Sequence, residues 1–86
     1  MTQKEKLVRR FLSKPRNFTF NEMRILLRGY GYKEIRSGKT AGSRIAFFHE
    51  DIHHIIRLHK PHPKNILKKY QLDFIENELR KKEFLK

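Results

Sequence analysis

Two short stretches with side chains of alternating character place the strongest limit on what this chain can fold into. They are residues 43–48 and 54–59. Successive side chains of a β-strand point to opposite faces, so residues two apart share a face. Ile45 and Phe47 share a face in the first stretch, and Ile56 and Leu58 do so in the second. We therefore expect two antiparallel strands whose four apolar side chains face a common core.

The flanking segments predict three helices and one further strand. Capping boxes at Thr2–Glu5 and Thr19–Glu22 each begin a helix, and apolar residues at helical spacing continue both. Pro15 ends the first helix near Ser13 because it disfavours helical geometry at the preceding residue. The expected elements are helices at about 3–13 and 20–28, a strand at 32–36 with Ile35 facing inward, and a last helix running from Ile66 to Leu79.

This order predicts one α+β domain over residues 1–86, with the helix at about 3–13 as an N-terminal addition. The elements follow one another along the chain in the order α-α-β-β-β-α. The economical arrangement is a three-stranded antiparallel sheet with the helices packed on one face. The open face would then carry the basic side chains of the strands, which are Arg36, Arg44, Arg57 and His59.

The charge balance indicates the kind of partner. Twenty-one Lys and Arg residues against nine Asp and Glu give a formal net charge of +12, which favours nucleic acid or, as an alternative, an acidic protein. The absence of Cys excludes disulfides and thiolate chemistry. No apolar run approaches the roughly 18 residues of a membrane span, and the charged N-terminus lacks a signal-like apolar region. We therefore expect a cytoplasmic protein that does not bind membranes.

A Gly-Lys-Thr sequence at residues 38–40 invites comparison with the phosphate-binding loop of nucleotide-binding proteins. The upstream glycine of that motif would fall at position 33, which is Lys33, and a strand follows instead of a helix. A nucleotide site is therefore disfavoured, although Lys39 and nearby backbone N–H groups can still bind a nucleic-acid phosphate.

Several of these segments together are similar to one known family. The segments are Phe18-Thr19-Phe20-Asn21-Glu22, a helix ending at Gly31-Tyr32, Gly42-Ser43-Arg44-x-x-Phe47, His59-Lys60-Pro61-His62-Pro63 and a Leu-rich basic helix. Over roughly residues 19–79 the chain resembles the HicA toxins of bacterial toxin–antitoxin pairs. The resemblance implies a small double-stranded-RNA-binding-like fold, cleavage of mRNA without a metal or other cofactor, and neutralisation by a HicB-type antitoxin. In shorter members the strand motif is Gly-Ser-His with a catalytic histidine, whereas this chain has Arg44 at that position.

The chemistry of metal-independent RNA cleavage selects the candidate site residues. It needs a base for the 2′-OH, a cation for the phosphorane and an acid for the leaving 5′ oxygen. Histidine suits the proton-transfer roles and arginine suits the cation role. His59 is the first candidate for proton transfer and His62 the second, while Arg44 and Arg57 would hold the scissile phosphate. Further phosphate contacts are expected from Lys39, Arg36 and Lys60.

Other interpretations of these residues remain open. His59 and His62 can instead be structural and donate to backbone carbonyls. His49, His53 and His54 lie at a polar turn and are expected to be solvated, and a metal site among the histidines is disfavoured because a strand separates the pairs.

Three functions are therefore weighed. The first is a HicA-like ribonuclease toxin, and the second is a non-catalytic RNA-binding module of the same fold. The third is a winged-helix DNA binder that uses the helix at 20–28 for recognition.

Overall fold

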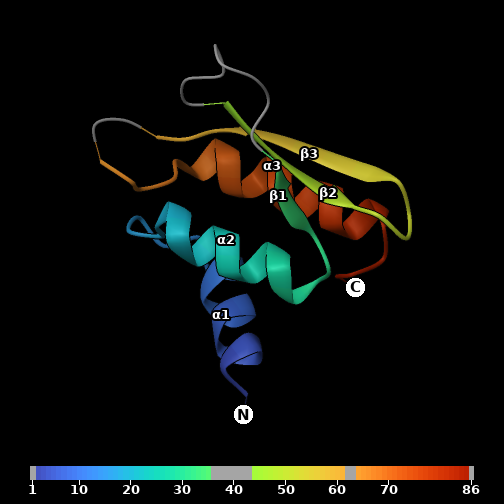
Figure 1. Ribbon diagram of the computed structural model, residues 1–86. Helices are drawn as coiled ribbons and strands as arrows, with labels where there is room; N and C mark the ends of the chain where they lie inside the picture. Colours follow the sequence, from blue (N-terminus) through green and yellow to red (C-terminus); the bar gives the residue numbers. More distant parts are fainter. Residues whose placement is uncertain (1, 36–43, 62–63, 86) are drawn as a thin grey trace.

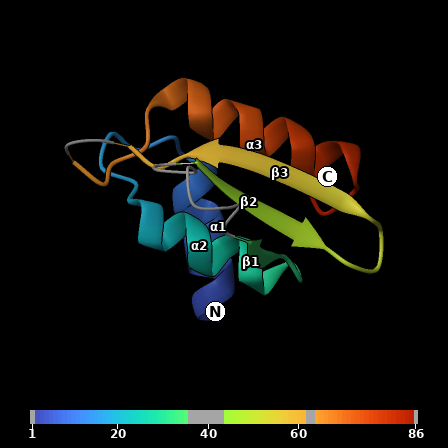
Figure 2. The same ribbon diagram turned by 45° about the horizontal axis from the view of Figure 1, so that its top comes forward.

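The computed structural model describes residues 2–35, 44–61 and 64–85, and its elements follow the predicted order (Figure 1). Three strands form an antiparallel sheet of order β1-β2-β3. Helices α2 and α3 lie on one face of this sheet, so the predicted α+β architecture is confirmed (Figures 1 and 2). The elements are α1 (Gln3–Leu12), α2 (Phe20–Gly29), β1 (Lys33–Ile35), β2 (Arg44–His49), β3 (His54–His59) and α3 (Lys69–Lys81).

The register of β2 and β3 confirms the predicted sorting of side chains. Ile45 lies opposite Leu58, and Phe47 lies opposite Ile56. All four are buried, and they pack with the apolar residues of the helices in one core. The helices contribute most of the remaining core, from Phe11, Phe20, Met23, Leu26, Leu27, Leu72, Ile75 and Leu79.

Both predicted helix N-termini are capped by threonine. The Thr2 hydroxyl accepts a hydrogen bond from the Glu5 N–H at 3.1 Å. At α2 the box is complete, because the Glu22 carboxylate also accepts from the Thr19 N–H at 2.9 Å. Helix α1 packs on α2 on the side away from the sheet and inserts the fully buried Phe11 into the core (Figure 1).

The predicted orientation of Ile35 is wrong. Pairing with β2 places Glu34 opposite the buried Phe47 and therefore on the helix side of the sheet. There the Glu34 carboxylate forms an ion pair with Arg24 of α2 at 2.7 Å. Ile35 consequently points to the outer face and is 41% exposed.

The last helix begins later than predicted because the preceding residues pair with another part of the backbone. The Leu67 N–H donates to the Phe18 carbonyl and the Phe20 N–H donates to the Asn65 carbonyl, both at 2.8 Å. This short bridge holds residues 65–67 extended beside the start of α2 and buries Leu67 in the core. Helical geometry therefore starts only at Lys69.

The prediction that all three turn histidines are solvated is wrong for two of them. His54 lies between the Tyr32 hydroxyl, 2.7 Å from its Nδ1, and the Glu78 carboxylate, 3.1 Å from its Nε2. Burial, with a contribution from Glu78, raises the pKa of Tyr32 to about 12. His49 is only 8% exposed and stacks on Phe84, which returns from the C-terminal end of the chain. His53 alone is exposed, at the turn between β2 and β3.

Among residues 2–35, 44–61 and 64–85, no helix has the length and apolar character needed to cross a bilayer.

Candidate nucleic-acid interface

The outer face of the sheet brings together the predicted basic residues of β2 and β3. Arg44 lies directly opposite His59, and Arg57 lies opposite Ala46, so all three basic side chains are on one face. They are exposed, and no described helix covers this face, which Figure 2 turns towards the reader. The shared face predicted for Arg44, Arg57 and His59 is therefore confirmed, while their chemical roles stay predictions.

These side chains line a shallow hollow of about 490 Å³. Its apolar lining includes the buried Ala46 and the partly exposed Ile35 and Ile55. A ligand here would contact two guanidinium groups and one imidazole above an apolar surface.

The positive charge of this face is not neutralised by neighbouring carboxylates. Within the described residues, neither Arg44 nor Arg57 takes part in an ion pair, and the His59 ring has no hydrogen-bond partner. On the helical side, by contrast, two arginines have carboxylate partners, in Arg10–Glu22 and Arg24–Glu34, each at 2.7 Å. The sequence explains the difference, because residues 35–49 and 52–72 contain no Asp or Glu. No nearby carboxylate of the described residues therefore opposes the attraction of a polyanion by Arg44 and Arg57.

Gln71 fixes the backbone that carries His59. Its amide Nε2 donates to the His59 carbonyl at 3.1 Å, and its Oε1 accepts from the Lys68 N–H at 2.9 Å. The Gln71 side chain is buried, so it ties the end of β3 to the start of α3. The sequence patterns above do not single out this residue. The available signal is a Gln three residues after a helix N-cap, which is half of a capping box.

Of the other predicted site residues, the structure describes only Lys60. Lys60 follows β3 and is half-buried, with its Nζ 6.0 Å from the centre of the Phe20 ring. Arg36, Lys39 and His62 lie outside the described residues, so their predicted roles stay predictions.

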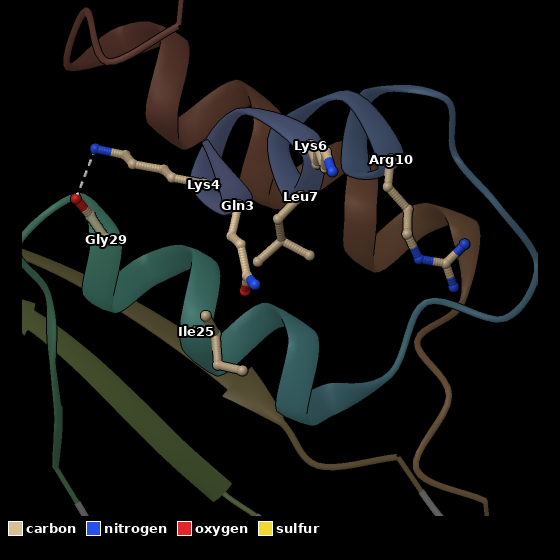
Figure 3. A pocket seen from close by; sticks show the side chains of 7 residues that line it. All are labelled: Gln3, Lys4, Lys6, Leu7, Arg10, Ile25 and Gly29. Carbon is tan, nitrogen blue, oxygen red and sulfur yellow. Dashed lines mark hydrogen bonds between the residues drawn. The ribbon is translucent and has the colours of Figure 1, made fainter. Parts of the chain in front are cut away.

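A second groove runs between α1 and α2, and Figure 3 shows its lining. Leu7 and Ile25 form its apolar part, and Ile25 is 59% exposed. Two of its cations are already engaged: the Lys4 ammonium donates to the Gly29 carbonyl at 2.8 Å, and Arg10 pairs with Glu22. Among the described residues that line it there is no imidazole or carboxylate, so this groove lacks the proton-transfer groups that RNA cleavage requires.

The outer face thus presents two guanidinium groups and one imidazole. The two guanidinium groups can hold a phosphate and stabilise extra negative charge on it. His59 can accept or donate a proton. His62, the alternative candidate for proton transfer, lies outside the described residues. Within the described part of the chain, no group of three or more His, Cys, Asp or Glu side chains is placed to hold a metal ion.

No protein-family model, curated protein or solved structure matches this chain. The likeness to HicA toxins therefore stays a prediction. The functional proposal depends on the residues of the outer face of the sheet.

Proposed function

We propose that the protein binds RNA on the outer face of its sheet and cleaves it without a metal ion, as a HicA-like toxin. One observation carries the proposal: Arg44 and His59 lie opposite each other on the exposed face, with Arg57 beside them, and no described carboxylate neutralises them. This combination provides a permanently charged phosphate ligand next to a group that can transfer a proton.

In the proposed reaction the RNA is its own nucleophile. The 2′-oxygen attacks the adjacent phosphorus as its proton passes to a base, and a 2′,3′-cyclic phosphate forms. The bond between phosphorus and the 5′ oxygen breaks, and an acid protonates the leaving oxygen. Arg44 and Arg57 stabilise the phosphorane, because arginine keeps its charge at every relevant pH and is a poor acid or base. His59, or His62 as the alternative, transfers the proton.

An acidic antitoxin of the HicB type is the proposed protein partner. The same face would attract it electrostatically, and the partly exposed Ile35 and Ile55 offer apolar contact area between the cations. Such a partner would exclude RNA by covering the hollow.

The test is cleavage of a purified mRNA in EDTA by the wild type and by His59→Asn. The control is His53→Asn, the same substitution at an exposed histidine in the turn between β2 and β3, where Asn tolerates the positive φ of 51°. We expect the His59 variant to lose about 10²- to 10⁴-fold in rate, the usual contribution of a positioned acid or base. The His53 variant should keep its activity. Equal cleavage by both variants, with unchanged thermal melting, would remove His59 from the mechanism.

A non-catalytic RNA-binding module remains the second candidate, because Arg44 stands where the resembling family has its catalytic histidine. In that case the EDTA assay would show no cleavage by the wild type, together with RNA binding that weakens steeply as salt rises.

Recognition of duplex DNA through α2 is less well supported. The guanidinium of Arg24 donates to the Asn21 side chain at 3.0 Å and also pairs with Glu34. Two of the few polar side chains on that helix are therefore bound within the protein and are not free to contact base edges.

A further inference from the structure

A second hollow meets the first at His59. His59 is among the lining residues of both, so the two hollows adjoin at the end of β3. Three segments form the second hollow: the connection between α1 and α2, the residues after β3 and the start of α3. Its described lining is Arg16, His59, Pro61, Lys64, Ile66, Lys68, Tyr70 and Gln71.

The chemistry of this second hollow is that of a polyanion site. Arg16, Lys64 and Lys68 are exposed, and none takes part in an ion pair with another described residue. The hollow has no acidic lining residue among those described. Its cations therefore extend the positive surface of the sheet beyond His59.

Tyr70 adds an aromatic surface to these cations. Its side chain is 68% exposed, more than that of any other exposed large hydrophobic residue in the described chain. A tyrosine in this position contributes little to the core. An exposed ring beside cations is, however, the usual arrangement for stacking a nucleic-acid base, which is sequence-tolerant because every base has a flat face.

We propose that the RNA is bound as a single strand that continues from the sheet face past His59 into this second hollow. There the base of a nucleotide next to the scissile phosphate stacks on Tyr70, and Arg16, Lys64 and Lys68 hold the following phosphates. The strand is single because the bases of a duplex are already stacked on each other and cannot offer a face to Tyr70. This inference rests on the proposed function and names its substrate class.

The test measures binding of fluorescent single-stranded RNA made uncleavable by 2′-O-methyl groups, so that affinity is read without turnover. The proteins are the wild type, Tyr70→Ala, Tyr70→Phe and Phe74→Ala. Phe74 is the matched control, since it is an exposed aromatic residue of the same helix that does not line the hollow. We expect Tyr70→Ala to weaken binding about 5- to 150-fold, the range for loss of one base–aromatic stack. Tyr70→Phe and Phe74→Ala should stay close to the wild type.

A series of RNAs with one abasic site each locates the stacked base. One abasic position should weaken wild-type binding as much as Tyr70→Ala does, and it should cost nothing further in that variant. Binding that depends on Arg44 but is unchanged in Tyr70→Ala would overturn the stacking site and leave the proposed function standing. Equal weakening of single-stranded and duplex RNA by Tyr70→Ala would overturn the single-strand assignment. Absence of RNA binding by the wild type would overturn both proposals.

Discussion

The salt dependence of RNA binding should reveal how many phosphates the outer sheet face contacts. Arg44 and Arg57 line the same hollow, are exposed and have no ion pair with a described residue, so each is free to replace a counterion on one phosphate. For single strands the logarithm of the binding constant falls by about 0.7 per contact for each tenfold rise in salt. We therefore expect the variant Arg44→Gln/Arg57→Gln to have a slope shallower than wild type by about 1.4. Between about 50 and 200 mM salt, the wild type should lose about sevenfold more affinity than the variant.

The measurement is fluorescence anisotropy of an uncleavable RNA titrated with protein over that salt range. The control variant is Lys6→Gln/Arg9→Gln, which removes the same number of charges from exposed positions of α1. If only the net charge of +12 mattered, the two double variants would behave alike. Equal slopes for both would refute the argument that the polyanion lies on the sheet face. A slope change confined to the Arg44/Arg57 variant would support it.

Two further predictions concern stability. Gly31 has φ +101°, and a Cβ there would lie 2.6 Å from the His49 Nε2. We therefore expect Gly31→Ala to destabilise the fold by about 2 kcal/mol or more. An unchanged urea midpoint would contradict this prediction. Hydrogen bonds from Lys14 hold the pKa values of Asp73 and Glu76 below their ordinary range. A carboxylate whose pKa is lowered in the folded state adds stability, and this stability is lost as the pH falls through that pKa. Below about pH 4.5, the free energy of unfolding of Lys14→Met should therefore fall less steeply than that of the wild type. Parallel stability curves for Lys14→Met and the wild type between about pH 5 and 3 would contradict this second prediction.

The parts of the fold that the sequence predicted correctly depend on local periodicity. Ile45, Phe47, Ile56 and Leu58 repeat every second residue over strands of six residues, long enough for the alternation to show which face is buried. The shared outer face of Arg44, Arg57 and His59 follows directly from that pattern. Alternation within the two strands is therefore sufficient to locate the basic face.

The errors come from partners distant in the sequence. β1 has only three residues, too few to show its buried face, and pairing with Phe47 turns Glu34 inward and Ile35 outward. The start of α3 is set by backbone pairing with Phe18, which helical spacing does not reveal. His49 is buried by Phe84, which lies 35 positions further along the chain. None of these contacts leaves a local pattern that a single sequence displays.

The position of the acidic residues decides which histidine of β3 has a carboxylate partner among the described residues. His54 and His59 occupy the two ends of the same strand. At the first end, Glu78 of α3 and the Tyr32 hydroxyl occupy both nitrogens of His54. At the other end the chain has no acidic residue from position 52 to 72, and His59 is a lining residue of two basic hollows. A carboxylate near His59 would also have competed with phosphate for Arg44. The absence of acidic residues around this end of β3 thus leaves both Arg44 and the His59 ring without a carboxylate partner among the described residues.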